Sequence, residues 1–204
     1  MNIAVTGGLG SGKSTASKIL AVAMAADHLD TDQLCRQQML PGSQGYAGFL
    51  QVFGDRYLLA DGSLNRQLLR KAVFADSGVK KKLEMILHPL VRRQVAEHYK
   101  QCCSTRKNLV VEVPLLFEVG WQYDFAVSVV VYVPEELCCS RVAIRDGLTS
   151  EEILRVNSSQ LPLSEKVKLA DFIIDNGGTF VSTVQQIVWL GRILQRREKD
   201  GKNG

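Results

Sequence analysis

The stretch Gly7-Gly8-Leu9-Gly10-Ser11-Gly12-Lys13-Ser14-Thr15 (GGLGSGKST) decides how the rest of this chain is interpreted. It fits the spacing G-x-x-x-x-G-K-[ST], follows the apolar run Ile3-Ala4-Val5 and precedes a helix-compatible segment. Glycines let the backbone curl around a phosphate with its N–H groups pointing inward, and the helix that follows adds its positive N-terminal end to the same anion site. The stretch therefore predicts a phosphate-binding loop, or P-loop, that holds a nucleoside triphosphate.

The polar residues of this loop have distinct chemical tasks at the phosphates. Lys13 is expected against the β- and γ-phosphates, and the Ser14 hydroxyl is expected to ligate Mg²⁺. The residues expected to contact the nucleotide are Gly8, Gly10, Ser11, Gly12, Lys13, Ser14 and Thr15. The loop thus predicts ATP as phosphoryl donor, with Mg²⁺ as its metal.

The composition is that of an ordinary globular protein. The chain has 204 residues, of which 46% are hydrophobic and 23% charged, so a single domain with an insertion can bury a core. The net charge of +4 fits an anionic substrate, and the basic residues are too dispersed to indicate nucleic acid. The five cysteines include no C-x-x-C spacing, so neither a zinc site nor a disulfide framework is expected. With no run near the ~20 apolar residues of a membrane span and no room for a signal peptide, we expect a cytoplasmic protein that binds no membrane and is a monomer.

Apolar strands alternate with helical stretches along the chain. Strands are expected at 3–6, 28–29, 109–113, 126–133 and 172–174. Helices are expected at 13–25, 64–74, 79–100, 135–145, 150–160 and 183–197. This alternation predicts an α/β fold of three layers, α/β/α, around a five-stranded parallel sheet covered on both faces.

A long segment between the second and third expected strands is polar, helical in pattern and rich in lysine and arginine. It is interpreted as an inserted helical subdomain for the second substrate, although for any one of its charges a solvated helix face is the stronger interpretation. The resulting division is a nucleotide-binding core at about 1–30, 107–135 and 168–195, an acceptor-binding subdomain at about 31–106, a lid at about 136–165 and a disordered tail at 196–204.

Among proteins with such a loop, a small-molecule kinase fits best. A GTPase would carry an N-K-x-D motif that reads the base, and this chain has none. An ATP-driven machine would be longer and would carry a strand that ends in a pair of acids. Glu112 follows the apolar run 109–111, but Val113 and Pro114 come next instead of a second acid.

A kinase needs a carboxylate that orients or deprotonates the acceptor hydroxyl. The segment 27–32 (DHLDTD) offers one just after the second strand, at the sheet edge where ligands bind in open α/β folds. In extended geometry Asp30 and Asp32 would share one side of the chain. We assign the chemistry to Asp32 and a supporting or N-capping role to Asp30, since capping is the ordinary role of an aspartate before a helix.

Phosphoryl transfer also needs cations near the transferring group. Arg141 and Arg145 are four residues apart, so they share a helix face, and Asp146-Gly147 then ends the helix. This arrangement suits a lid over ATP, which Arg155 could join. The alternative for each arginine is a solvated helix face paired with a nearby glutamate.

At this point the chain resembles the dephospho-CoA kinase family. The resemblance rests on segments in a fixed order along residues 3–190: GGLGSGKST, DTDQLCRQ (30–37), DGSLNRQLLRKAVFAD (61–76), LHPLV (87–91), VPLLFE (113–118), RDGLTSEE (145–152), QLPLSEK (160–166) and KLADFIIDNGG (168–178). Apart from the P-loop each segment is modest evidence alone, whereas their common order is highly specific.

The resemblance implies ATP-dependent phosphorylation of the ribose 3′-hydroxyl of dephospho-coenzyme A, the last step of coenzyme A synthesis. It places the catalytic aspartate at Asp32, and the arginines of the lid at Arg141 and Arg145. Asp30, Arg66, His88 and Leu115 are the candidates for the acceptor side. For His88 a buried, hydrogen-bonded role at a Pro89 turn is an equal alternative.

The chain departs from the family before DTD. It reads AMAADHLD, where family members carry a glycine turn into the second strand, so the end of the first helix stays open. Two other functions also stay open: a kinase of the nucleoside monophosphate type, and a sensor that binds ATP without transferring phosphate. The carboxylates and the lid arginines argue against the sensor, which needs no base.

Overall fold

The computed structural model describes residues 1–147 and 160–200, without the side chains of residues 145, 146, 199 and 200. The chain divides into two compact units. One comprises Met1–Asp30 and Tyr99–Gly204, and contains the sheet; the other, Thr31–His98, is helical. We call them the core unit and the helical unit.

The core unit is built on a five-stranded parallel sheet in the order β2-β3-β1-β4-β5. Its strands are β1 (Asn2–Gly7), β2 (Asp27–Asp30), β3 (Leu109–Glu112), β4 (Val127–Tyr132) and β5 (Phe172–Asp175). All five lie where the apolar runs predicted them, and the α/β fold is confirmed. The P-loop follows β1, the central strand, at the carboxyl edge where the direction of the strand order reverses.

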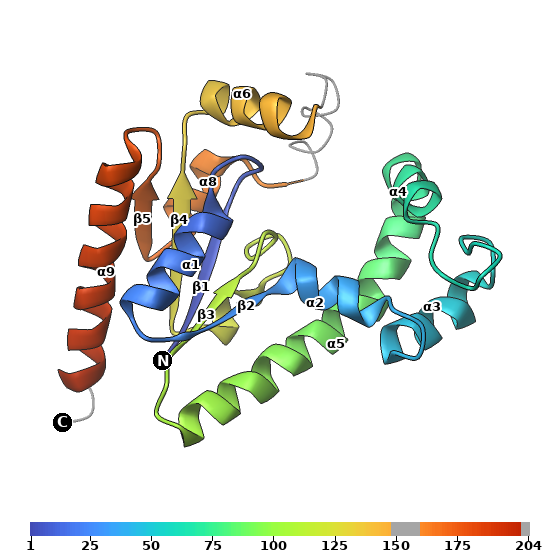
Figure 1. Ribbon diagram of the computed structural model, residues 1–204, viewed down its shortest axis with the longest axis horizontal. Helices are drawn as coiled ribbons and strands as arrows, with labels where there is room; N and C mark the ends of the chain where they lie inside the picture. Colours follow the sequence, from blue (N-terminus) through green and yellow to red (C-terminus); the bar gives the residue numbers. More distant parts are fainter. Residues whose placement is uncertain (148–159, 201–204) are drawn as a thin grey trace. The chain divides into compact units, whose positions relative to one another are not determined.

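Helices cover both faces of this sheet (Figure 1). They are α1 (Lys13–Ala23), α6 (Glu135–Asp146), α8 (Leu163–Leu169) and α9 (Phe180–Asp200), with a short 3-10 turn, η1 (Trp121–Asp124). The connection from β1 to β2 contains α1, and the connection from β4 to β5, which runs in the opposite direction along the sheet, contains α8. Because both crossovers are right-handed, α1 and α8 lie on opposite faces of the sheet. α9 packs against α1, and α8 against β4. No helix among the described residues is long and apolar enough to cross a membrane.

The core under α1 and α9 is formed by alternate strand residues. Ile3, Val5 and Val129 are fully buried there against Leu20 and Ile187. The intervening positions, which point to the other face, are equally apolar and buried: Ala4, Val111 and Val130. Burial on both faces explains why these strands are continuous apolar runs without alternation.

The C-terminal helix is longer than the sequence indicated. α9 extends to Asp200, so residues 196–200 of the expected disordered tail are helical. Leu194 is fully buried in the core, and the guanidinium of Arg197 lies 5.0 Å from the ring centroid of Phe172. These contacts attach the last turns to the sheet, and stacking of this kind contributes about 0.5–1 kcal/mol.

The helical unit contains α2 (Thr31–Gln38), α3 (Gln44–Phe53), α4 (Arg66–Ala75) and most of α5 (Ser77–Ser104), whose last residues belong to the core unit. Its own apolar core holds Met39, Phe49, Tyr57, Leu69 and Leu87. The sequence analysis did not resolve α2 and α3 as separate helices within the expected helical insertion. α5 continues through Pro89, so no turn lies at that position.

The first helix ends at an alanine in a conformation that favours glycine. Ala25 has φ of +49°, its N–H donates to the carbonyl of Val22, and the N–H of Ala26 donates to the carbonyl of Ala21. This is a Schellman arrangement with alanine at the position that is usually glycine. The end of the helix is therefore regular even though the expected glycine is absent.

We predict that Ala25→Gly stabilises the protein by about 0.5–1 kcal/mol, because the left-handed conformation costs an alanine more than a glycine. Ala23→Gly, inside the same helix, is the matched control and should destabilise by a similar amount. Urea unfolding of both variants measures the two changes. Destabilisation by both would show that the conformation of residue 25 carries no strain.

Candidate active site

The P-loop wraps the start of α1 through two glycines with positive φ. Gly10 has φ of +79°, and Gly12, the N-cap of α1, has φ of +83°. The N–H of Ser11 donates to the carbonyl of Gly8 at 3.2 Å, which closes the turn. Ser11, one of the predicted nucleotide contacts, is fully buried in the loop. The N–H of Thr15 donates to the carbonyl of Gly12 at 3.1 Å, whereas the N–H groups of Lys13 and Ser14 precede this first turn and are available to an anion.

Asn176, directly after β5, holds this loop from the side. Its Nδ2 donates to the carbonyl of Ser11 at 2.8 Å, and its Oδ1 accepts from Thr183 Oγ1 at 2.9 Å. A Cβ on Gly12 would come within 2.4 Å of that Nδ2, so a side chain at residue 12 would displace Asn176. The sequence analysis included Asn176 only as part of the family segment KLADFIIDNGG (168–178).

A carboxylate lies behind the residue predicted to hold Mg²⁺. Ser14 Oγ donates to Glu112 Oε1 at 2.6 Å, and Ser17 Oγ donates to Glu112 Oε2 at 3.5 Å. Glu112 is 3% exposed, at the end of β3. Ser17 also lies 2.9 Å from His28 Nε2, and burial lowers the pKa of His28 below its ordinary value. A hydroxyl backed by a carboxylate is an all-oxygen donor set, which suits Mg²⁺.

A second carboxylate and a buried lysine join the segment after β3 to the start of α8. Lys166 Nζ is fully buried and lies 2.8 Å from Glu118 Oε1 and 3.0 Å from the carbonyl of Pro114. Glu118 Oε1 also accepts from the N–H of Leu161 at 2.9 Å. Burial lowers the pKa of Lys166, as does the ammonium of Lys13, so the two lysines lie within electrostatic reach of each other.

Arg141 lies on α6 beside the loop, in contact with Asn176. Its Nη2 donates to the Asn176 carbonyl at 3.1 Å. Together with Thr15 and Phe180 it lines a pocket of about 230 Å³ between α1 and the start of α9. Its predicted role at the transferring phosphate stays a prediction.

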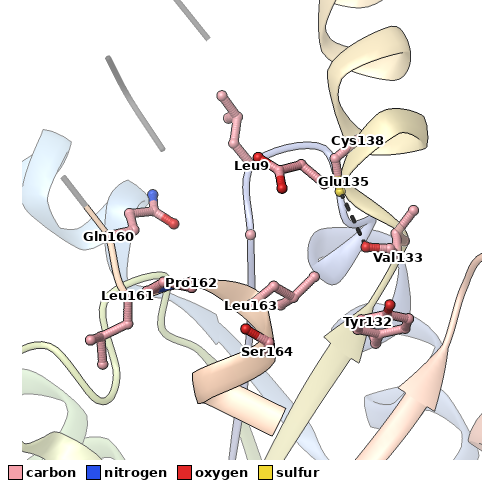
Figure 2. Close-up of a pocket in the computed structure, with 11 residues that line it drawn as sticks. Leu9, Tyr132, Val133, Glu135, Cys138, Gln160, Leu161, Pro162, Leu163 and Ser164 are labelled. Carbon is pink, nitrogen blue, oxygen red and sulfur yellow. Dashed lines mark hydrogen bonds between the residues drawn. The ribbon is translucent and has the colours of Figure 1, made fainter. Parts of the chain in front are cut away.

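A larger pocket of about 610 Å³ lies against Gly8 and Leu9 of the loop (Figure 2). It is lined by Gly8, Leu9, Tyr132, Val133, Glu135, Cys138, Gln160, Leu161, Pro162, Leu163 and Ser164. Cys138 donates its thiol hydrogen to the carbonyl of Val133 at 3.8 Å, the dashed contact in Figure 2, and burial raises its pKa. The thiol therefore stays protonated near neutral pH, as expected for a small apolar filler.

The two aspartates of DTD belong to different elements. Asp30 ends β2 and Asp32 lies in the first turn of α2, so the segment is not extended across both residues. The expectation that they share one side of an extended chain is therefore wrong, because α2 begins directly at Thr31. The Asp32 side chain is exposed.

The other predicted acceptor residues are spread over the chain. Arg66, exposed at the first residue of α4, lines a pocket of about 250 Å³ in the helical unit. His88 is half-buried within α5, and burial lowers its pKa; because the helix continues through Pro89, the alternative role at a turn is wrong. Leu115 is half-buried in the segment after β3. The side chain of Arg145, all of Arg155 and residues 150–159 of the helix expected at 150–160 lie outside the described residues.

A P-loop on the central strand of a parallel β2-β3-β1-β4-β5 sheet, with a helical unit inserted after β2, defines a small-molecule kinase of the P-loop class. The family model for dephospho-CoA kinase matches residues 1–182. The chain belongs to the dephospho-CoA kinase family, whose reaction is the ATP-dependent phosphorylation of dephospho-CoA.

One relative and two solved structures are similar to this chain over nearly its whole length. A dephospho-CoA kinase of Desulfotalea psychrophila is 38% identical over 199 residues, which cover 98% of this chain and 99% of the relative. A dephospho-CoA kinase structure from Campylobacter jejuni has a TM-score of 0.69 at 28% identity and covers 98% of both chains. A crystal structure from Thermus thermophilus has a TM-score of 0.80 at 31% identity, with 96% of this chain and 97% of that one covered.

We predict that Lys166→Met destabilises the protein by about 3–5 kcal/mol, because it leaves Glu118 as a buried carboxylate without its counter-ion. Lys168→Met is the matched control, since Lys168 and Glu165 form a 2.7 Å pair whose side chains are 69% and 50% exposed. That exposed pair should contribute under about 1 kcal/mol. Equal losses in urea unfolding for both variants would contradict the assignment of Lys166 as a buried ion-pair partner.

Proposed function

We propose that this chain transfers the γ-phosphoryl group of ATP to the ribose 3′-hydroxyl of dephospho-CoA and releases coenzyme A and ADP, as the last step of coenzyme A synthesis. The observation that carries the proposal is the Ser14–Glu112 hydrogen bond of 2.6 Å at the mouth of a P-loop, in a chain of this family. It supports a metal-dependent donor site, where a bare glycine loop would support only anion binding.

The donor side is supported by the loop and the pocket next to it. The N–H groups at the start of α1 and the ammonium of Lys13 would hold the phosphates. The pocket of about 230 Å³ would then take the base, with the planar guanidinium of Arg141 over it. Arg141 and Arg145, the arginines of the lid that the resemblance implies, are proposed to help Lys13 neutralise the transferring group.

The Ser14 hydroxyl would hold Mg²⁺, with Glu112 fixing its rotamer. When bound with ATP, the metal neutralises charge on the β- and γ-phosphate oxygens. The contribution of the chain is to orient one oxygen ligand and to keep a carboxylate behind it.

The helical unit supports an acceptor that is both anionic and apolar. Its pocket of about 250 Å³ has Met39, Leu69 and Leu87 in its lining, together with the arginines at positions 36, 66 and 70. Guanidinium groups pair with phosphate in a bidentate way, and the apolar lining fits an uncharged arm. Dephospho-CoA has both parts, whereas AMP has no such arm.

Asp32 is proposed as the general base. Its carboxylate would accept the proton of the 3′-hydroxyl while the hydroxyl oxygen bonds to the γ-phosphorus and the bond to the ADP oxygen breaks. Asp30, at the end of β2, has a supporting role in this proposal.

The deciding experiment offers the purified full chain Mg²⁺-ATP together with dephospho-CoA, AMP or adenosine. We expect ADP release only with dephospho-CoA, and ³¹P NMR of the product should show a new phosphomonoester on the ribose 3′-oxygen. Transfer to AMP would favour a kinase of the nucleoside monophosphate type. ATP binding without transfer to any acceptor would favour a nucleotide sensor.

We predict that Asp32→Asn lowers kcat by roughly 10²-fold or more, because the amide cannot accept the hydroxyl proton. The ATP dissociation constant, measured by calorimetry without acceptor, should change by less than about twofold, a free-energy difference under about 0.4 kcal/mol. Asp55→Asn, in the same unit, is the control and should retain wild-type turnover. Near-normal turnover of Asp32→Asn would remove Asp32 from the mechanism.

A further inference from the structure

A chain of polar contacts runs from β2, beneath α1, to the residue proposed to hold Mg²⁺. His28 Nε2 lies 2.9 Å from Ser17 Oγ, Ser17 Oγ lies 3.5 Å from Glu112 Oε2, and Glu112 Oε1 accepts from Ser14 Oγ at 2.6 Å. All four residues belong to the core unit. The proposed reaction uses Ser14 and Glu112 but assigns no role to Ser17 or His28.

The Ser17 hydroxyl has a single hydrogen and more than one acceptor. The carbonyl of Ser14 lies 3.1 Å from Ser17 Oγ, and Glu112 Oε2 lies on the other side. If His28 Nε2 carries a hydrogen, it donates to Ser17 Oγ and leaves the hydroxyl hydrogen for these acceptors. If Nε2 is bare, the hydroxyl hydrogen turns to the imidazole and both acceptors lose it.

Because Ser17 and Glu112 are buried, the acceptor that receives the Ser17 hydroxyl hydrogen affects the hydrogen bonding of Glu112. Ser17 is fully buried and Glu112 is 3% exposed, so water does not easily replace a lost contact. Burial is the main cause that lowers the pKa of His28. The positive charge of Lys18 on α1 also lowers this pKa, whereas the negative charge of Asp30 on the same strand as His28 raises it. The imidazole is therefore neutral near pH 7, with one nitrogen as donor and the other as acceptor.

We propose that His28 is a positioning residue for the metal ligand: its Nε2–H donates to Ser17 Oγ, and through Ser17 and Glu112 it sets the direction of the Ser14 hydroxyl. The inference rests on the proposed function, since it takes Ser14 as the ligand of Mg²⁺. It does not place His28 in contact with either substrate. Outer groups of this kind commonly change metal affinity by about 10- to 100-fold when removed.

The test compares His28→Leu, which keeps much of the volume but has no donor, with His28→Gln, whose side-chain NH₂ can replace the imidazole N–H. ATP affinity is measured by calorimetry without acceptor, in the presence and absence of Mg²⁺. In His28→Leu the Mg²⁺-induced gain in ATP affinity should fall by about tenfold, and Mg²⁺-free binding should change little. His28→Gln should restore most of the gain, and His98→Leu, on α5, should leave it unchanged.

Three outcomes would overturn the inference. One is an unchanged Mg²⁺ effect in His28→Leu. Another is an equal loss of ATP affinity with and without Mg²⁺, which would make His28 a packing residue of the loop. The third is independent of variant folding: ¹⁵N NMR of the wild-type imidazole should show Nε2 protonated, and a bare Nε2 contradicts the proposal. Turnover of the wild-type chain with dephospho-CoA tests the proposed function separately. A failure of the proposed function can therefore be distinguished from a failure of the role proposed for His28.

Discussion

The backbone of the phosphate-binding loop has no room for a side chain at Gly7, where a Cβ would lie 2.8 Å from the carbonyl of Val131, or at Gly10 and Gly12, and the rest of the site depends on this constraint. A Cβ on Gly10 would meet the carbonyl of Cys138 and the side chain of Val142 at 2.7 Å, and one on Gly12 would meet Asn176. Gly10 and Gly12 also have positive φ. The loop is thus held by packing from α6 and from the end of β5, and its shape does not follow from its own sequence alone.

The short segment that begins at the end of β3 supplies the other half of the framework. Glu112 faces the hydroxyls of α1, whereas Glu118 faces the ammonium of Lys166 and the N–H of Leu161. Both carboxylates are shielded from water, so each needs a fixed set of donors. The Pro114 carbonyl, which accepts from Lys166, also accepts from Thr6 Oγ1 at 3.2 Å, which joins this segment to β1. One segment therefore ties the loop, the central strand and α8 together.

The parts of the fold that the sequence predicts are those with a local signal. Strands β1, β3 and β4 are apolar because both sheet faces are covered there, and the loop is a contiguous pattern of glycines. The sequence analysis missed Asn176 as a support of the loop, because its contact with Ser11 spans 165 positions and nothing near residue 176 indicates it. It also misjudged the tail, because the stacking of Arg197 on Phe172 and the burial of Leu194 are tertiary contacts. The extended geometry assumed for Asp30 and Asp32 failed because a helix begins between them.

The position of Glu112 near the loop follows from the register of the sheet and could not be found by searching for a motif of consecutive acids. The sequence analysis counted acids after the third strand and set Glu112 aside because no second acid follows it. In the sheet β3 lies beside β1, and the register pairs Glu112 with Val5, so the carboxylate is at the level where the loop begins. Ser14 and Ser17 are three residues apart on α1 and share the face that Glu112 meets. A single carboxylate with two oxygens serves both hydroxyls, which is why strand order is more informative here than the number of acids.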